Sequence, residues 1–139
     1  MPNLLFRGFD ISASAMSAER LRMTVAAENL ANAQSTRPLA DGLPYARQRV
    51  VFRAELDRAG QLTGQVRAEV VPSPRYVQRY DPEHPDAGPD GMVTMSDIDP
   101  ILELVDLLTA SRSYDANANA SRNLLRMHES ALRLGDIQG

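Results

Sequence analysis

The residues best suited to chemistry lie in one loop, "DPEHPDAGPDG", at residues 81–91. Four carboxylates and an imidazole there are ligand types that divalent cations accept: Asp81, Glu83, His84, Asp86 and Asp90. Their spacing is not that of an EF-hand, because a proline stands fifth from Asp81 and no glycine stands sixth. Two prolines instead indicate a rigid turn in which Asp caps backbone amides and His bonds locally. We therefore expect no metal site and a structural loop that contains Asp81, Pro82, His84 and Pro85.

The other polar side chains do not form a catalytic set. His128 and Glu129 are adjacent in sequence, so on a helix they do not face each other. Ser111, Ser113 and Ser121 have no paired base, and the chain has neither a Gly-x-Ser-x-Gly motif nor a glycine-rich phosphate loop. We expect no enzyme activity, no catalytic residue and no cofactor.

Charge and composition exclude several classes of partner and site. The net charge is −3, from 15 basic residues and 18 acidic residues, and the basic residues form no stripe. Nucleic-acid binding, which needs clustered positive charge, is therefore not expected. The chain contains no cysteine, which excludes disulfides and thiolate metal sites.

The hydropathy pattern predicts neither a membrane span nor a cleaved signal peptide. No window approaches the 18 or more apolar residues that cross a bilayer. Near the N-terminus, Arg7 and Asp10 interrupt the apolar run that a secretory signal requires.

The first predicted element is a helix from Asp10 to about Ala33, with Asp10 or Ser12 as its N-cap. Its apolar side chains fall into two stripes about 150° apart. One stripe holds Ile11, Ala15, Ala18, Leu21 and Val25, and the other holds Met16, Met23, Ala27 and Leu30. The pattern fits a helix that contacts both its own chain and another chain, and it equally fits a fully buried helix in a bundle.

Short strands and turns are predicted between residues 34 and 98. The strand segments are 45–52, 61–71, 75–80 and 91–95, and Pro- or Gly-containing turns separate them. This composition indicates a small β-rich insert.

A second helix is predicted from Asp99, as N-cap, and Pro100, at the first helical position. It runs to Leu134 and stops at Gly135. A 3/4 repeat passes through Leu104, Leu107, Ser111, Tyr114, Ala118, Ser121, Leu125, His128 and Leu132. The small polar residues at its centre favour helix poorly, so we expect neighbours to stabilise it.

The predicted fold is therefore α+β, with two long terminal helices paired as a coiled-coil-like unit around a small β-rich insert. We expect three segments: an N-terminal assembly helix at 1–33, the insert and its loops at 34–98, and a C-terminal assembly helix at 99–139.

Three stretches resemble a known family. "ENLANAQST" and "LLTASRSYDANANASRNLL" resemble signature segments near the two ends of the axial proteins of the bacterial flagellum, which are the rod, hook and hook-associated proteins. "YDPEHPDAGPDGMVTMSDIDPILELVDLLTASRSY" is similar to the short proximal rod proteins of that family. Met92 and "SDID" at 96–99 depart from the family pattern, in which an aromatic residue and an Asn are usual.

The resemblance implies a structural subunit of the proximal rod, a tubular driveshaft that transmits torque and conducts exported proteins. It implies a place in the periplasmic part of the basal body, reached through the flagellar type III export apparatus without a cleaved signal. The implied partners are other copies of the chain, adjacent rod proteins and the rod adaptor near the inner-membrane ring.

Assembly is expected through both helices. On the first helix the expected interface consists of Ile11, Ala15, Met16, Ala18, Leu21, Met23, Val25, Ala27, Asn29, Leu30 and Asn32. On the second it consists of Leu104, Leu107, Leu108, Ser111, Arg112, Tyr114, Asn117, Ala118, Leu125 and Leu132. An alternative interpretation is a non-flagellar helical adaptor or binding module that uses the β insert.

The stretch "NLANAQST" at residues 29–36 closes the first helix with polar side chains. Buried amides need hydrogen-bond partners, and Ala31 and Ala33 leave room for another segment to approach. We predict that Asn29 and Asn32 bond to backbone across the junction between this helix and the insert.

Overall fold

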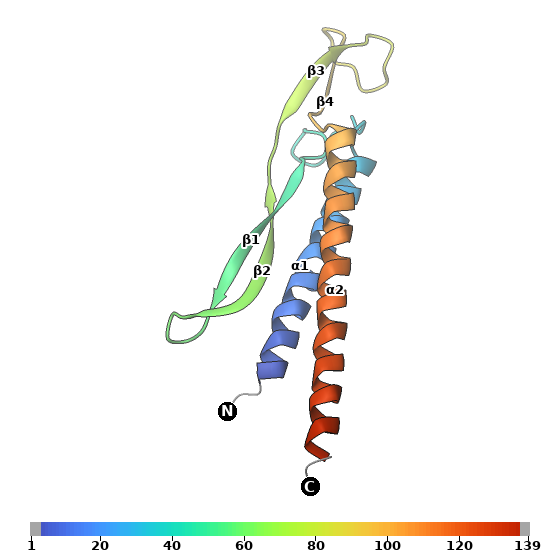
Figure 1. Ribbon diagram of the computed structural model, residues 1–139. Helices are drawn as coiled ribbons and strands as arrows, with labels where there is room; N and C mark the ends of the chain where they lie inside the picture. The colour runs from blue at the N-terminus through green and yellow to red at the C-terminus, as the bar shows by residue number, and fades with distance from the viewer. Residues whose placement is uncertain (1–3, 137–139) are drawn as a thin grey trace. The chain divides into compact units, whose positions relative to one another are not determined.

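The computed structural model describes residues 4–136 and has two long helices with four strands between them (Figure 1). In chain order the elements are α1 (Leu4–Ala31), β1 (Gln48–Leu56), β2 (Leu62–Pro72), β3 (Tyr76–Tyr80), β4 (Met92–Ser96) and α2 (Pro100–Asp136). This arrangement confirms the predicted α+β class. The first three and last three residues of the expected assembly helices lie outside the described residues.

The fold divides into two compact units that share the long elements. Unit 1 contains α1 up to Leu21, residues 52–69, and α2 from Thr109. Unit 2 contains residues 22–51 and 70–108. Each unit therefore combines a piece of both helices with a piece of the insert.

The predicted start of α1 is wrong, because Leu4, the first described residue, is already helical. Gly8 lies inside the helix, and a Cβ atom there would be 2.9 Å from Leu124 Cδ1 of α2. A glycine that disfavours helix in isolation is thus placed where the second helix approaches closely. Tertiary packing therefore outweighs the local signals at Asp10 and Ser12.

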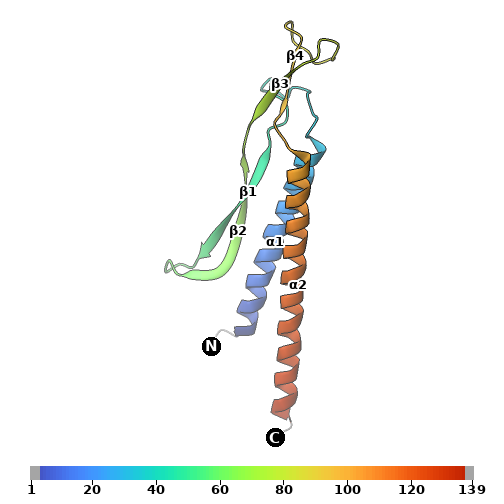
Figure 2. The same ribbon diagram turned by 45° about the horizontal axis from the view of Figure 1, so that its top comes forward.

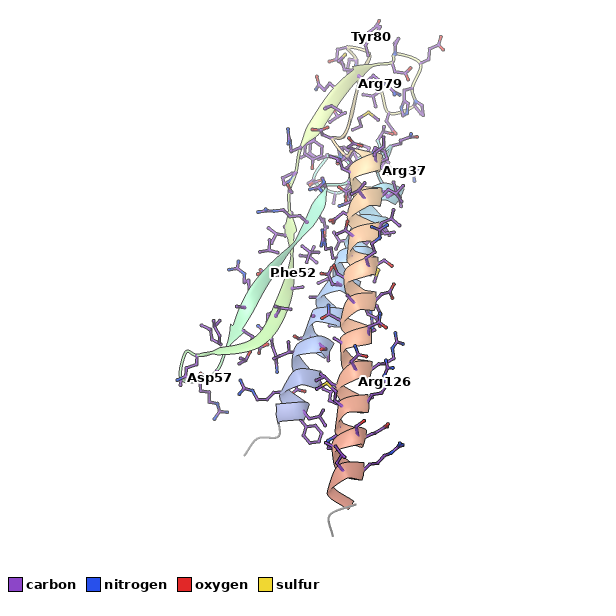
Figure 3. The ribbon with its side chains drawn as sticks, in the orientation of Figure 1. Arg37, Phe52, Asp57, Arg79, Tyr80 and Arg126 are labelled. Atoms are coloured by element: carbon purple, nitrogen blue, oxygen red, sulfur yellow. The ribbon has the colours of Figure 1, made fainter. Side chains whose placement is uncertain are left out.

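The strands form two separate two-stranded sheets, β1 with β2 and β3 with β4. β3 and β4 are antiparallel, with Gln78 opposite Thr94, and they lie side by side in both Figure 1 and Figure 2. The predicted strand positions are confirmed to within a few residues, except that β1 continues to Leu56. Asp57 lies at the tip of the β1–β2 hairpin (Figure 3), where its Oδ1 accepts the backbone N–H groups of Ala59 and Gln61.

The predicted start of α2 is confirmed. Asp99 Oδ1 accepts a hydrogen bond from Ile101 N at 2.9 Å, and Pro100 is the first helical residue. The predicted stop is wrong, because the helix continues through Gly135 to Asp136. Gly135 does not take the positive φ of a glycine that ends a helix.

The buried core is small and made of small side chains. In unit 1 it includes Ala18 and Ala110, which are 3% and 0% exposed. In unit 2 it includes Val25, Ala26 and Val93. Many large aliphatic side chains are exposed instead, and most of these lie on α2.

Candidate assembly interface

Asn29, near the end of α1, binds the backbone of Gln48, the first residue of β1, through both the nitrogen and the oxygen of its side-chain amide. Its Nδ2 donates to Gln48 O at 2.7 Å, and its Oδ1 accepts from Gln48 N at 3.0 Å. The side chain is 1% exposed. The predicted bond to backbone across the junction is therefore confirmed for Asn29.

Three further side chains complete this group, which we call the junction cluster: Asn29, Tyr45, Arg47, Gln48 and Glu103. Glu103, on the first turn of α2, accepts from Asn29 Nδ2 at 3.0 Å and from Arg47 Nε at 2.7 Å. Tyr45 donates its hydroxyl to Asn29 Oδ1 at 2.9 Å. The cluster thus joins both helices to the insert inside unit 2.

The electrostatics of the cluster act on Tyr45. Partial burial raises the pKa of its phenol above the ordinary value of 10.0, and the negative charges of Glu28 and Glu103 raise it further. Arg47 opposes this rise because its positive charge favours the phenolate. Tyr45 is therefore held as a neutral hydrogen-bond donor.

The prediction for Asn32 is wrong. Its Nδ2 donates to Glu28 O in the last turn of α1, and its Oδ1 accepts from Ser35 Oγ. Asn32 therefore caps its own helix and does not reach across the junction. Asn32 lies beyond Ala31, the last residue of α1, so the helix no longer sets the direction of its side chain.

The inner face of α2, the side that the chain itself covers, is mostly polar. Its positions repeat every four and three residues and are buried or half-buried: Glu103, Leu107, Ala110, Tyr114, Asn117, Ser121, Leu124 and His128. Four of them belong to the predicted repeat, but Leu104 and Leu125 are 46% and 47% exposed. A search for an apolar repeat begins at Leu104 and passes over Glu103 and Asn117, which explains the shift by one residue at those turns.

The residues of the interface expected on the first helix differ in how far the chain covers them. Ala18, Val25 and Asn29 are buried, whereas Ile11 and Ala27 are exposed. The half-buried members are Ala15, Met16, Leu21, Met23, Leu30 and Asn32. Ile11 lies against β2, because a Cβ atom at Gly64 would be 2.8 Å from Ile11 Cδ1.

On α2 the first turns carry an exposed apolar face. Ile101, Leu104, Val105 and Leu108 are 71%, 46%, 54% and 51% exposed. Farther along, Arg112 is exposed and Leu132 is 57% exposed. Ser111, Tyr114, Asn117 and Ala118 are half-buried, and Arg20 lies 5.9 Å from the centre of the Tyr114 ring.

The loop after β3 is held by local hydrogen bonds. His84 Nδ1 accepts from Asp86 N at 3.0 Å, and Asp81 N donates to Gly91 O at 2.9 Å. Thr36 donates its hydroxyl to Asp86 Oδ2, which ties the loop to the segment after α1. Within residues 4–136, no group of three or more His, Cys, Asp or Glu side chains is placed to hold a metal ion.

Comparison with known proteins gives matches at both ends of the chain and along most of its length. A family model described as "Flagella basal body rod protein" matches residues 9–38, and one described as "Flagellar basal body rod FlgEFG protein C-terminal" matches residues 90–134. The flagellar basal-body rod protein FlgC of Aquifex aeolicus is 42% identical over 118 residues, covering 84% of this chain and 86% of its own length. FlgC of Salmonella typhimurium is 40% identical over 130 residues, covering 91% of this chain and 95% of its own length.

The chain belongs to the FlgC family of flagellar basal-body rod proteins. FlgC of Bacillus subtilis is 32% identical over 146 residues, covering 94% of this chain and 97% of its own length. Membership confirms the resemblance seen in the three sequence stretches. It also confirms that the chain is no enzyme, since FlgC proteins are structural components of the rod.

The two family models match the two parts of this chain that contain most of the two helices. The first includes Asn29 and the turn after it, and the second includes Glu103 and most of α2. Tyr45 and Arg47 lie outside both models. Neither helix among the described residues has a segment long and apolar enough to cross a membrane.

Proposed function

We propose that this chain is a structural subunit of the flagellar rod and that it joins neighbouring subunits through its two terminal helices. The observation that carries this proposal is the combination of FlgC family membership with helix faces that the chain leaves uncovered. Exposed large aliphatic side chains gathered on one face mark a surface that another protein covers.

The burial pattern divides the expected interface into two groups. Ala18, Val25 and Asn29 are covered by the chain itself, so their part in assembly is to hold the helices in shape. The exposed members make the proposed direct contacts with neighbouring subunits: Ile11, Ala27, Leu104, Leu108, Arg112, Leu125 and Leu132.

We infer the partners from the family name, which places FlgC proteins in the rod of the flagellar basal body. Other copies of the chain, adjacent rod proteins and the rod adaptor near the inner-membrane ring are the proposed neighbours. We also propose the periplasm as the site of assembly, the flagellar type III apparatus as the route of export, and torque transmission around a central channel as the task. The FlgC relatives are all named basal-body rod proteins, which supports this set.

Swimming and incorporation into the basal body test the proposal. Leu125→Asp places a charge on an exposed position of α2, whereas Leu62→Asp does the same on β2, where the leucine is 70% exposed. We expect Leu125→Asp to abolish swimming in a strain that lacks its own copy, and to be missing from purified basal bodies. The Leu62→Asp chain should assemble.

Circular dichroism of both purified variants controls for folding. Normal swimming with Leu125→Asp, in a chain that is present in the basal body, would contradict assembly through this part of α2.

A further inference from the structure

Two consecutive turns form the first half of the loop after β3, and each has proline at its second position. They comprise residues 81–84 and 84–87, where His84 N donates to Asp81 O at 3.2 Å and Ala87 N donates to His84 O at 3.0 Å. In such a turn the side chain of the first residue can accept a hydrogen bond from the backbone N–H of the third. Asn, Asp and Ser are the usual residues at this position. The first residue of the second turn is instead His84.

The imidazole of His84 is the acceptor in the second turn. Its Nδ1 accepts the backbone N–H of Asp86 at 3.0 Å, and His84 is half-buried. Nδ1 can accept a hydrogen bond only when the ring is neutral and carries its proton on Nε2. A protonated imidazole donates at both nitrogens, so it cannot make this hydrogen bond. The turn as we observe it therefore requires a neutral His84.

Asp86 connects this turn to the segment that follows α1. Its Oδ2 accepts the hydroxyl of Thr36 at 2.8 Å. The hydrogen bond to His84 thus fixes the backbone of the same residue whose carboxylate holds Thr36. Loosening the backbone of Asp86 weakens the hydrogen bond to Thr36, so a change at the His84 ring reaches the segment between α1 and β1.

The base of the loop does not depend on His84. Asp81 N donates to Gly91 O and Gly88 N donates to Met92 O, both at 2.9 Å. The first of these bonds continues the antiparallel pairing of β3 with β4, and both join backbone groups that do not titrate. We therefore expect any response of His84 to be confined to the outer part of the loop.

Charged side chains come from the loop itself and from the two segments bonded to it. The segment after α1 contributes Arg37 and Asp41, and β3 contributes Arg79, which is labelled in Figure 3. Arg79 Nη2 lies 3.6 Å from Asp81 Oδ2. The ion pairs found among residues 4–136 do not include His84. His84 therefore acts through its hydrogen bond to Asp86. The carboxylates of the loop are Asp81, Glu83, Asp86 and Asp90.

We propose that His84 makes the outer part of this loop sensitive to acid. At neutral pH the uncharged ring holds the Asp86 amide and, through Asp86, the tether to Thr36. Protonation removes the acceptor, so the turn opens and the tether weakens. The change is reversible, because loss of the proton restores the acceptor. This device goes beyond the proposed rod function, since it lies within one chain and needs no neighbouring subunit.

Backbone amide hydrogen exchange, measured by NMR on the full-length chain, tests the proposal. The protection factor of the Asp86 amide, corrected for the pH dependence of exchange itself, is compared at about pH 7.5 and about pH 5. Histidines protonate within this range, whereas Asp and Glu side chains stay mostly ionised. Protection at Asp86 should fall roughly fivefold on acidification, the factor that corresponds to one typical hydrogen bond. The amides of Asp81 and Gly88 should keep their protection.

His84→Asn is the matched variant. Asn Oδ1 and His Nδ1 are both bonded to Cγ, so Asn can accept the same N–H but cannot take up a proton. It should keep Asp86 protected at both pH values. His84→Ala lacks an acceptor and should show the low protection of the acidified wild type at both. His128→Gln changes the other histidine of the chain and should respond to pH as the wild type does.

Three results would overturn the proposal. One is a wild-type protection factor at Asp86 that is the same at both pH values. The second is a His84→Asn chain that loses this protection as the wild type does, because the titrating group would then lie elsewhere. The third comes from long-range ¹H–¹⁵N spectra of the ring, which would contradict the proposal if the neutral His84 carried its proton on Nδ1. Circular dichroism confirms that each variant is folded.

Discussion

Glu103 is a charged side chain that is almost completely buried, at 2% exposure, with partners for both carboxylate oxygens. Arg47 Nη2 lies 2.6 Å from Glu103 Oε1, and Asn29 Nδ2 donates to Glu103 Oε2. Removing one member of such a group costs more than the pair contributes, because the remaining polar groups stay buried without partners. Glu103 is therefore the residue of the junction cluster on which the folding of unit 2 depends most.

Replacing Glu103→Gln keeps the shape of the side chain but removes its charge. We expect the free energy of unfolding to fall by about 3 kcal/mol, because the Arg47 charge loses its counter-ion. Urea denaturation followed by circular dichroism measures the change. Glu129→Gln on the same helix is the control, since that side chain is exposed and should change stability little. Equal stability of the two variants would rule out a stabilising role for the Glu103 contacts.

Tyr45 makes the junction cluster sensitive to alkaline pH. Its pKa is raised in the folded chain, so folding favours the neutral phenol. The stabilising contribution is complete below the unfolded pKa of about 10 and is lost as the pH rises through the folded pKa. The free energy of unfolding should therefore decrease above about pH 10 by a component that is absent in Tyr45→Phe.

The measurement is urea denaturation of wild type and Tyr45→Phe at neutral and alkaline pH. At neutral pH the variant should lose about 1 kcal/mol, the value of one hydrogen bond. Tyr80→Phe serves as a control, because Tyr80 is 68% exposed. A wild-type chain and a Tyr45→Phe chain that lose stability in parallel above pH 10 would disprove the role given to Tyr45.

At the scale of elements, Gly8 shows how closely α1 and α2 approach in unit 1. Added side-chain atoms at this position meet Leu124, whereas nothing lies within 4 Å of a Cβ atom at Gly135. Both glycines are helical, but Gly135 is the penultimate residue of α2, so a better helix former should stabilise the helix at Gly8 at least as much as at Gly135. A lower stability of the Gly8 variant therefore reports packing.

Gly8→Leu should lower the free energy of unfolding by about 1–3 kcal/mol, as overpacking of a helix contact does. Gly135→Leu should leave it unchanged or slightly higher. Thermal unfolding followed by circular dichroism compares the two variants. If Gly8→Leu unfolded at the same temperature as Gly135→Leu, the close helix contact would not exist in solution.

Local signals in the sequence located some element boundaries and missed others for physical reasons. Asp99 and Pro100 predicted the start of α2 because capping depends on adjacent residues only. The start of α1 was missed because Gly8 is stabilised by Leu124, which is 116 positions away in the sequence. Long-range packing of this kind leaves no mark in the residues next to Gly8.

The candidate site was predictable to a similar extent. The need of buried Asn29 for a backbone partner was visible in the sequence, but the other side chains of the junction cluster, Tyr45, Arg47 and Glu103, were not. With Asn29 they come from three separate segments of the chain, and only the fold brings them together. Glu103 was also missed because a search for apolar repeats passes over a carboxylate.

At the scale of the whole molecule, exposed aliphatic side chains make association the expected state at high concentration. Any partner that binds only the native chain stabilises it by mass action. The melting temperature should therefore rise with protein concentration in the wild type. Leu108→Glu should remove this dependence, whereas Leu62→Glu should keep it, because both leucines are exposed but only Leu108 lies on the exposed apolar face of the first turns of α2.

Differential scanning calorimetry over a range of concentrations measures this effect. Concentration-independent melting of the wild type would show that copies do not associate, and equal behaviour of the two variants would show that association does not use α2.

The pair of hydrogen bonds between Asn29 and Gln48 also affects whether a further strand can pair with the beginning of β1. Two residues opposite each other in an antiparallel ladder exchange an N–H and a C=O in the same way, so the Asn29 carboxamide occupies the place that a further strand would take beside Gln48. A two-stranded sheet has open edges that favour uncontrolled aggregation through strand pairing. At the beginning of β1, α1 closes that edge with a single side chain, which blocks the addition of a further strand at that point.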